Sequence, residues 1–491
     1  MDRRAFLLGA SGLAATAYSG GRLARLALPR PDPRLRSLAA RLSGPVITPA
    51  DSAYNGARLV YNERYDAVRP LAIARPVSVE DVRRIVAWAA TEGVLPIARS
   101  GGHSYAGYST GAGLVVDLRS LAGIAYDRSS GVATIGAGAR LIDIEAALAA
   151  HGRAIPSGSC ATVGIGGLAQ GGGVGLASRM FGTTSDNVLS LGIVTADGAH
   201  RVCDSSANED LYWACRGGGG GGNFGIVTHF AFRTHPISSV SYFFADWSWS
   251  QASEVIEAWQ AWMPHAADEL YTICSLAGGG SPSVLVFGQY LGSENSLGRA
   301  LAPLLRVPGS RLTTGSSSYL DAQLRWAGCL GKTTSQCHLA DETPQGTLQR
   351  AAFAAKSDYL NAPLSAAGRA TLLGAVEHGV GTILLDSYGG AINRRAANET
   401  AFVHRDALGS AQYLAYWSSA AGERAASRWL RDSQAAMRPY VSGFAYQNYI
   451  DHDLAGWEHA YYGANYPRLQ RVKRDVDPGE LFRFAQSIRP A

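Results

Sequence analysis

The 491-residue sequence lacks several patterns that assign chains to common protein classes. Beyond residue 17, no stretch reaches the roughly 18 continuous apolar residues of a membrane-spanning helix, so we expect no membrane span. The net charge of +5 is small, and lysine and arginine form no basic stripe with interleaved aromatic residues, which argues against nucleic-acid binding. No segment repeats at a fixed period, so a solenoid or propeller is unsupported. The length predicts a globular chain of two or three domains.

Several chemical motifs are also missing or incomplete. There is no G-x-x-x-x-G-K-[ST] loop, and Gly171-Gly-Gly-Val-Gly lacks the strand-then-helix spacing of a dinucleotide fingerprint. The polar run Asp451-His452-Asp453, even with His459, has no metal-ligand spacing, so we predict no metal. Gly107-Tyr-Ser109-Thr-Gly111 fits the pattern of hydrolase nucleophiles but leads into an apolar strand rather than a helix. These observations disfavour nucleotide hydrolases, metalloenzymes and serine hydrolases.

The N-terminus predicts export. Arg3-Arg4 precedes Phe6-Leu7 and a mostly apolar run that ends at Ala17, which is the twin-arginine pattern followed by a signal core too short to span a bilayer. We place the cleavage after Ala17 and a linker up to residue 33. This route carries folded proteins and suits a cofactor inserted before export. The alternative is a frayed amphipathic terminus.

Six cysteines are present, and in an exported protein some should pair. Cys329 and Cys337 enclose a short Gly/Thr/Ser-rich loop and are the first candidates for a disulfide. Cys203 with Cys215 comes second. For every cysteine except Cys160, the alternative is a free buried thiol.

What the sequence has in excess is glycine. Its 58 glycines exceed the average share of about 7% and concentrate in residues 101–113, 158–175 and 217–225. Two of these segments contain one reactive side chain each: His103 in Arg99-Ser-Gly-Gly-His-Ser-Tyr, and Cys160 in Ser157-Gly-Ser-Cys-Ala-Thr-Val-Gly-Ile-Gly-Gly. Glycine loops can bring bare N–H groups close to an anionic ligand. The clustering therefore predicts ligand-cradling loops.

Hydrophobic periodicity predicts an α+β protein with two kinds of sheet. Short strands alternate with helices up to about residue 236, including a helix over 78–90 that starts at a capping box, Ser78 with Asp81. Farther on, longer strand-like segments are separated by helical stretches, which predicts an antiparallel sheet. The expected strands are 71–74, 94–98, 113–118, 132–135, 189–195, 225–232, 240–249, 283–290 and 382–388, and the other expected helices are 141–150, 252–263 and 423–437.

The His103 and Cys160 loops, followed by Gly171-Gly-Gly-Val-Gly and Thr184-Ser-Asp-Asn187, closely resemble the berberine bridge enzyme-like branch of the FAD-linked oxidases. This branch lies in the vanillyl-alcohol oxidase (PCMH-type) superfamily. The resemblance implies a two-subdomain FAD-binding domain of the PCMH type over 34–236, after a signal and linker over 1–33. It further implies a substrate domain over 237–440, with an antiparallel sheet covered by helices, and a C-terminal segment over 441–491 that returns to the FAD domain.

The resemblance also implies the cofactor site. FAD would be held by two covalent bonds, from His103 to the flavin 8α-methyl group and from Cys160 to ring carbon 6. Two tethers would raise the reduction potential and hold the ring still. The alternatives are a hydrogen-bonding loop histidine and a small buried cysteine. The other residues predicted to contact FAD are Arg99, Ser100, Gly101, Gly102, Ser104, Tyr105, Gly107, Val163, Gly164, Gly167, Gly172, Val227 and Asn448.

A third segment, Tyr446-Gln-Asn448-Tyr449, resembles the family's stretch over the flavin, where tyrosine acts as the catalytic base. In a strand, Tyr446 and Asn448 would share a face while Tyr449 points away, so both tyrosines reach the site only if the chain turns there. A tyrosine with the ordinary pKa of about 10 needs help to act as a base near neutrality. Tyr388 is a third candidate, and an aromatic strand in the core is the alternative.

Two positions refine the expectation. Several relatives carry a tyrosine where this chain has Val174, so a second tyrosine role would fall to Tyr449 or Tyr388, or one base suffices. Val163 resembles the small residue that leaves room for oxygen in family oxidases, which favours an oxidase.

The predicted function is a secreted FAD oxidase that acts on a hydroxyl or hemiacetal carbon of a sugar or secondary metabolite and converts O₂ to H₂O₂. The alternatives are oxidative ring closure or desaturation in natural-product biosynthesis, and a flavin-binding protein without turnover. The expected partners are a small-molecule substrate and O₂, and the protein is expected to be a monomer or homodimer.

Overall fold

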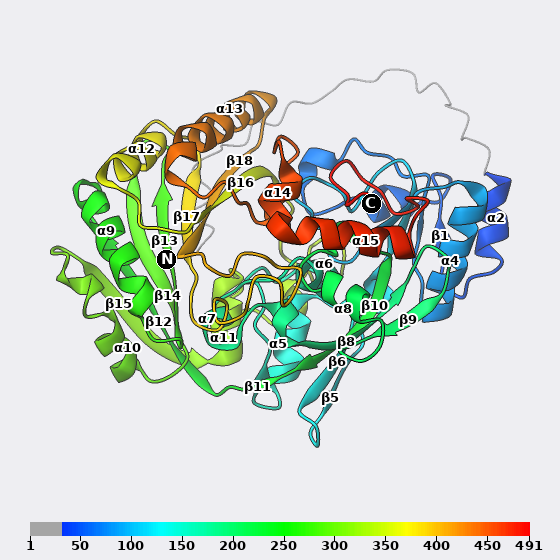
Figure 1. Ribbon diagram of the computed structural model, residues 1–491, viewed down its shortest axis with the longest axis horizontal. Helices are drawn as coiled ribbons and strands as arrows, with labels where there is room; N and C mark the ends of the chain where they lie inside the picture. Colours follow the sequence, from blue (N-terminus) through cyan, green and yellow to red (C-terminus); the bar gives the residue numbers. More distant parts are fainter. Residues whose placement is uncertain (1–31) are drawn as a thin grey trace.

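The computed structural model describes residues 32–491. The predicted export signal and its cleavage after Ala17 lie outside the described residues. The described chain forms two lobes side by side, and its C-terminal helices return to the first lobe (Figure 1). Within residues 32–491, no helix is both long and apolar enough to cross a membrane.

The first lobe starts with a four-stranded sheet in the order β1-β2-β4-β3, in which β2, β4 and β3 are parallel. Helix α4 begins after Ser78, whose side chain accepts a hydrogen bond from Asp81 N, and ends at Gly93 with a φ of +65°. The predicted capping box is only half formed, because the Asp81 carboxylate accepts bonds from N–H groups of the loops around the helix start. The bounds are α2 (Pro33–Ala39), β1 (Val46–Ile47), α3 (Tyr54–Ala57), β2 (Ala72–Ala74), α4 (Val79–Glu92), β3 (Pro96–Arg99) and β4 (Leu114–Asp117).

A five-stranded antiparallel sheet completes the first lobe, in the order β5-β6-β10-β8-β9. It shares one apolar core with the smaller sheet. Its elements are β5 (Ile124–Asp127), β6 (Val132–Gly136), α5 (Leu141–Ala149), α6 (Ile165–Gln170), α7 (Ser178–Phe181), β8 (Val188–Val194), β9 (His200–Cys203), α8 (Glu209–Ala214) and β10 (Ile226–Arg233). The short strands β7 (Arg153–Ala154) and β11 (His235–Pro236) pair beside it, and the predicted boundary at 236/237 follows β11.

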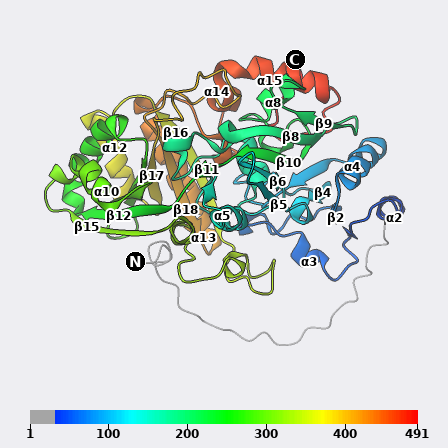
Figure 2. The same ribbon diagram turned by 90° about the horizontal axis from the view of Figure 1, so that it is seen from below.

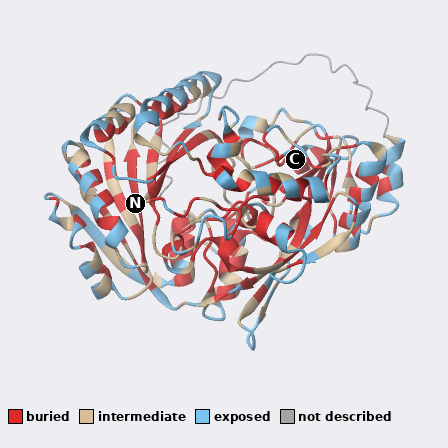
Figure 3. Cartoon of the chain, in the orientation of Figure 1, coloured by how far each residue is buried: buried red, intermediate tan, exposed pale blue. Residues whose placement is uncertain are grey.

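The second lobe is a seven-stranded antiparallel sheet in the order β15-β12-β14-β13-β17-β18-β16. Helices α9, α10, α12 and α13 cover its outer face (Figure 1), and α10 and α12 lie at the same end of the molecule in the view from below (Figure 2). The central strands are largely buried, whereas the edge strand β15 has no buried residue and the helices turn exposed faces outward (Figure 3). The bounds are β12 (Ser239–Trp247), α9 (Ala252–Trp262), β13 (Leu270–Ala277), β14 (Ser283–Tyr290), α10 (Glu294–Leu301), β15 (Arg311–Ser318), α11 (Tyr319–Trp326), β16 (Ala352–Leu360), α12 (Ala366–Glu377), β17 (Thr382–Ser387), β18 (Gly409–Trp417) and α13 (Ala420–Met437). The predicted fold class, an α+β chain whose second part is an antiparallel sheet covered by helices, is confirmed.

The C-terminal segment contains α14 (Trp457–Tyr462) and α15 (Tyr466–Val476). Its apolar residues join the core of the first lobe. The buried Lys473 ammonium donates hydrogen bonds of 2.6 Å to Asn223 O, to Phe482 O and to the Asp477 carboxylate. This segment is therefore fastened to the first lobe.

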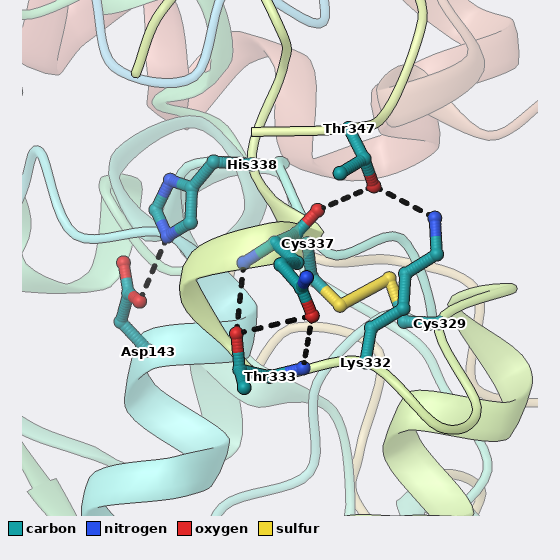
Figure 4. Close-up of a disulfide and its surroundings, with 8 residues drawn as sticks. Asp143, Cys329, Lys332, Thr333, Cys337, His338 and Thr347 are labelled. Atoms are coloured by element: carbon teal, nitrogen blue, oxygen red, sulfur yellow. Dashed lines mark hydrogen bonds and ion pairs between the residues drawn. A yellow bond between two sulfur atoms is a disulfide. The ribbon is translucent and has the colours of Figure 1, made fainter. Parts of the chain in front are cut away.

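The first disulfide prediction is confirmed, because Cys329 and Cys337 are joined (Figure 4). The bridge packs against Ile142 and Ala161 of the first lobe, and the adjacent His338 bonds to Asp143 at 3.0 Å. The second prediction is wrong: Cys203 and Cys215 are free thiols. Both are fully buried in the apolar core of the first lobe, where they act as small apolar side chains.

Candidate active site

A cavity between the two lobes brings the predicted site residues together. It is lined by the glycine-rich loops of the first lobe, by the inner face of β13, β17 and β18, and by the C-terminal turn at Tyr446. The predicted residues that line it are Ser100, Gly101, Gly102, His103, Ser104, Tyr105, Cys160, Val163, Gly164, Gly167, Val227, Tyr388, Tyr446, Asn448 and Tyr449. Segments more than 300 positions apart in the sequence thus share one cavity.

Three residues predicted to contact FAD lie behind this lining instead. The buried Arg99 guanidinium donates to Ala57 O at 2.6 Å and to Ser109 O at 3.1 Å, so it fastens the loop that follows β3. Gly107 has a φ of +72° and lies against the Tyr65 ring. Gly172 has a φ of +108° and lies against the Phe402 ring. These three residues therefore support the loops from behind and do not line the cavity.

The His103 and Cys160 loops pack backbone to backbone. A Cβ on Gly101 would lie 2.2 Å from Gly164 N, and a Cβ on Gly164 would lie 2.0 Å from the Ser100 Oγ. Any larger residue would push the loops apart. The two loops therefore form one continuous wall only because glycine occupies both positions.

We expect Gly164→Ala to lower the stability of the protein by about 3 kcal/mol, because overpacking against a fixed backbone is at the upper end of its usual cost. The variant should also retain less flavin, since its two loops are displaced. Thermal unfolding and the ratio of flavin to protein absorbance measure the two effects. Gly123→Ala is the matched control, as a Cβ there would meet nothing within 4 Å. A Gly164→Ala protein with the melting temperature and flavin content of Gly123→Ala would contradict the prediction.

His103 is held as a neutral imidazole. Its ring stacks on Tyr61 at 4.1 Å, and its Nε2 lies 2.8 Å from the Thr162 Oγ1. Burial, helped by the nearby charge of Arg140, lowers the pKa of His103 to about 3. A neutral imidazole keeps a nitrogen lone pair at physiological pH, which is the form that can bond to an electrophilic carbon.

Cys160 is the exposed member of the free cysteines that the structure describes; the others are buried. It lines the same cavity as His103, on the turn before α6. Burial raises the pKa of the Cys203, Cys215 and Cys274 thiols, which makes them inert. Cys160 is therefore the accessible thiol at this site.

The Tyr446 segment is a turn, not a strand. Residues Gln447–Tyr449 form a 3₁₀ turn, so the predicted alternation of side chains is broken and both tyrosines reach the cavity. The Tyr446 hydroxyl oxygen accepts hydrogen bonds from Gly173 N at 3.0 Å and from Asn448 Nδ2 at 2.9 Å. Burial nevertheless raises the pKa of Tyr446 to about 12, although these two bonds oppose the shift.

The inner face of the large sheet adds residues that sequence reasoning missed. Alternate residues of β17 and β18 line the cavity: Leu384, Asp386, Ser410, Gln412, Leu414 and Tyr416. The Asp386 carboxylate accepts the Tyr271 hydroxyl at 3.2 Å, and its negative charge helps raise the pKa of Tyr388, Tyr446 and Tyr449. Asp386 stands two residues before Tyr388, and this spacing was the feature of the sequence that could have pointed to it.

Val174 lines the cavity beside Tyr446. It contributes a methyl surface where several relatives are expected to carry a hydroxyl. Tyr449 stacks on Tyr105 at 5.3 Å and meets the Tyr446 ring at 4.9 Å, while the Tyr388 hydroxyl lies 3.0 Å from that of Tyr359. Either Tyr449 or Tyr388 could therefore supply a second tyrosine hydroxyl at the site.

The cavity fits a large ligand with many polar atoms. Both amide atoms of Gln447 are buried without a hydrogen-bond partner, as are Ser109 Oγ and Gln170 Oε1, and all three residues line the cavity. A Cβ on Gly167 would point into open space there. Within residues 32–491, no cluster of His, Cys, Asp or Glu is suited to hold a metal ion. The unpartnered polar atoms and bare backbone match the demands of a dinucleotide cofactor better than those of a small apolar ligand.

Comparison with known families identifies that cofactor. Residues 70–204 match the family model described as "FAD binding domain", and residues 445–489 match "Berberine and berberine like". The first match contains the His103 and Cys160 loops, and the second contains the Tyr446 turn. The fold and the cavity thus define an FAD-dependent oxidoreductase.

Full-length relatives specify the family. An uncharacterised FAD-linked oxidoreductase of Bacillus subtilis is 33% identical over 92% of this chain and 98% of its own length. A xylooligosaccharide oxidase of Thermothelomyces thermophilus is 30% identical over 86% of this chain and 88% of its own. The solved structure of BBE-like 1 from Physcomitrella patens superposes with a TM-score of 0.87, at 33% identity and over 93% and 99% of the two chains. The chain belongs to the berberine bridge enzyme-like family of FAD-linked oxidoreductases.

Proposed function

We propose that this protein is an oxidase that carries FAD on two covalent bonds and oxidises a hydroxyl or hemiacetal carbon of a sugar or secondary metabolite. The observation that carries the proposal is that His103, Cys160, Asp386 and Tyr446 line one cavity. His103 would bond to the flavin 8α-methyl group and Cys160 to ring carbon 6. When bound, FAD supplies the acceptor for the substrate hydride, and O₂ takes up the electrons as H₂O₂.

Tyr446 is the proposed base for the substrate hydroxyl proton. Gly173 N and Asn448 Nδ2 donate to its oxygen and would stabilise a phenolate. The raised pKa makes the phenolate scarce near neutrality. The same raised pKa makes it a strong base once it is formed. Asp386 would accept a second hydrogen bond from the substrate and so orient the reacting hydroxyl.

We propose that the substrate is extended. Ser410, Gln412, Leu414 and Tyr416 line it from one strand, and at about 3.3 Å per residue they span about 20 Å. Asp386 pairs in register with Ser410 at one end of this row, while Tyr416 stands at the other. Such a row suits an oligosaccharide or a glycosylated metabolite, and the relative named xylooligosaccharide oxidase supports the first.

A second function is oxidative ring closure or desaturation of a natural product. Tyr105 and Tyr449, stacked 13° from parallel, form an aromatic wall that suits a flat substrate. Detection of a new ring in the product, in place of a carbonyl or lactone, would favour this reaction.

Peroxide release tests the main proposal. We expect H₂O₂ when the flavoprotein meets a panel of xylooligosaccharides, monosaccharides and aromatic glycosides under air. Val163 lines the cavity at the position expected to admit oxygen. Reduction of the flavin without peroxide would indicate a dehydrogenase, and no reduction by any hydroxyl compound would defeat the proposal.

Asp386→Asn should slow flavin reduction by about 100-fold or more, since it removes a charged acceptor from the cavity but keeps its shape. Anaerobic stopped-flow reduction measures this rate. Asp358→Asn is the matched control, because Asp358 is a buried aspartate of the same sheet that does not line the cavity. Equal rates for Asp386→Asn and the unmodified enzyme would remove Asp386 from the mechanism.

We also propose export by the twin-arginine route, supported by Arg3-Arg4 and the short apolar run after them. The full-length chain should accumulate outside the cytoplasm. Replacement of both arginines by lysine should keep it inside, and export of that variant at the normal level would contradict the proposal.

A further inference from the structure

Glu145 is a buried carboxyl group that the proposed reaction does not use. It lies on α5, is 2% exposed, and does not line the cavity. Its Oε1 accepts the Ser157 hydroxyl, and the Tyr319 hydroxyl approaches the same carboxylate. Burial raises the pKa of Glu145 to about 7, while the hydroxyls of Ser157 and Tyr319 act in the opposite direction. Such a group is costly to bury unless its hydrogen bonds serve the local structure.

Its partner Ser157 begins the turn that carries Cys160. The other side of the turn is bound to the same helix, where Ile142 N donates to Ala161 O at 3.1 Å and Leu141 N donates to Val163 O at 3.0 Å. These donors are the free N–H groups of the first turn of α5. The turn that carries Cys160 is thus hydrogen-bonded to α5 on both sides of the cysteine. The bonds after Cys160 come from backbone N–H groups, and the bond before it is accepted by the Glu145 side chain.

The second lobe reaches this attachment through Tyr319, the first residue of α11. The Tyr319 hydroxyl interacts with Glu145, and α11 packs against α5. His103, in contrast, stacks on Tyr61 and stands on the loop after β3. The Glu145 contact therefore holds the part of the turn that precedes Cys160. His103 contacts Thr162, which follows Cys160.

We propose that Glu145 is a positioning residue for Cys160: by holding Ser157, it places the thiol where it can bond to the flavin. The inference rests on the proposed attachment of FAD through Cys160. In that reaction an S–C bond replaces the thiol S–H bond and the C–H bond at ring carbon 6. The two electrons and two protons released pass to O₂ as H₂O₂, the same acceptor as in turnover. Glu145 itself touches neither reactant.

The test is the linkage of the flavin in purified holoenzyme. Digestion of the unmodified protein should give a flavopeptide that joins the His103 and Cys160 peptides. In Glu145→Ala and Ser157→Ala we expect at least a tenfold lower fraction of joined peptide, because a displacement of about 1 Å can cost about 100-fold in rate. The flavin should remain on the His103 peptide. Glu145→Gln should restore the joined peptide, since its amide oxygen still accepts the Ser157 hydroxyl.

Asp143→Ala is the matched control, because Asp143 is a carboxylate on the same helix that faces His338 instead. It should leave the joined fraction unchanged. The inference is overturned if Glu145→Ala or Ser157→Ala keeps a joined fraction within twofold of the unmodified protein, or if either variant loses both linkages alike. Ser157→Ala removes one hydroxyl and decides the matter if Glu145→Ala fails to fold. Absence of the joined peptide from the unmodified protein would instead refute the proposed attachment itself.

Discussion

Tyr446→Phe should slow the reduction of the flavin by substrate about 100- to 10,000-fold, the usual range for loss of a general base. The change removes one oxygen atom, which accepts hydrogen bonds from Gly173 N and Asn448 Nδ2 and faces the cavity. The aromatic packing of Tyr446 against Tyr449 and Phe402 should remain. Anaerobic stopped-flow absorbance at the flavin band measures the rate directly.

The same experiment has a pH signature. With the pKa of Tyr446 raised to about 12, the phenolate fraction grows about tenfold with each pH unit below that value. The reduction rate should therefore rise between pH 6 and 10 in the unmodified enzyme and lose this rise in Tyr446→Phe. Tyr413→Phe is the control, because Tyr413 is a buried tyrosine on β18 that does not line the cavity. A Tyr446→Phe enzyme as fast as this control would show that another group takes the proton.

His103→Ala and Cys160→Ala should each leave the flavin attached through the other residue, and the double variant should leave it free. The two side chains line one cavity from separate loops, so loss of one does not remove the other. Acid precipitation separates the outcomes: yellow colour stays with the protein of either single variant and moves to the supernatant for the double variant.

Cys215→Ala controls for loss of a thiol as such, because Cys215 is buried far into the apolar core and should have no effect on attachment. Colour wholly in the supernatant of the unmodified protein would rule out covalent attachment. Release from only one single variant would assign a single bond to the residue that was replaced.

The sequence alone was sufficient where a local pattern determines the structure. Ser78 and Gly93 bound a helix because a hydroxyl caps its first turn and glycine adopts the left-handed conformation at its end. The His103 and Cys160 loops were found because glycine clusters are rare and their motifs specific. The short loop between Cys329 and Cys337 likewise led to the correct disulfide.

The rest depends on contacts between distant residues. Tyr449 reaches the cavity only because the chain turns after Tyr446, which an aromatic segment does not reveal. Asp386 gained its importance from the tyrosines that other elements bring around it. Arg99 and Gly107 belonged to the right motif but support the loop from behind, and a motif cannot distinguish lining residues from supporting ones.

The two faces of strand β18 have different roles: one lines the cavity and the other packs in the core. Residues 410, 412, 414 and 416 face the cavity, whereas Ala411, Tyr413 and Ala415 lie in the core beneath the outer helices. Substitutions at residues 410, 412 and 416 can reshape the substrate space while Ala411, Tyr413 and Ala415 keep their packing, whereas Leu414 also packs against Phe353 and Ala355. A one-residue insertion would exchange the two faces. The strand thus offers a compact set of positions for a library aimed at new substrates.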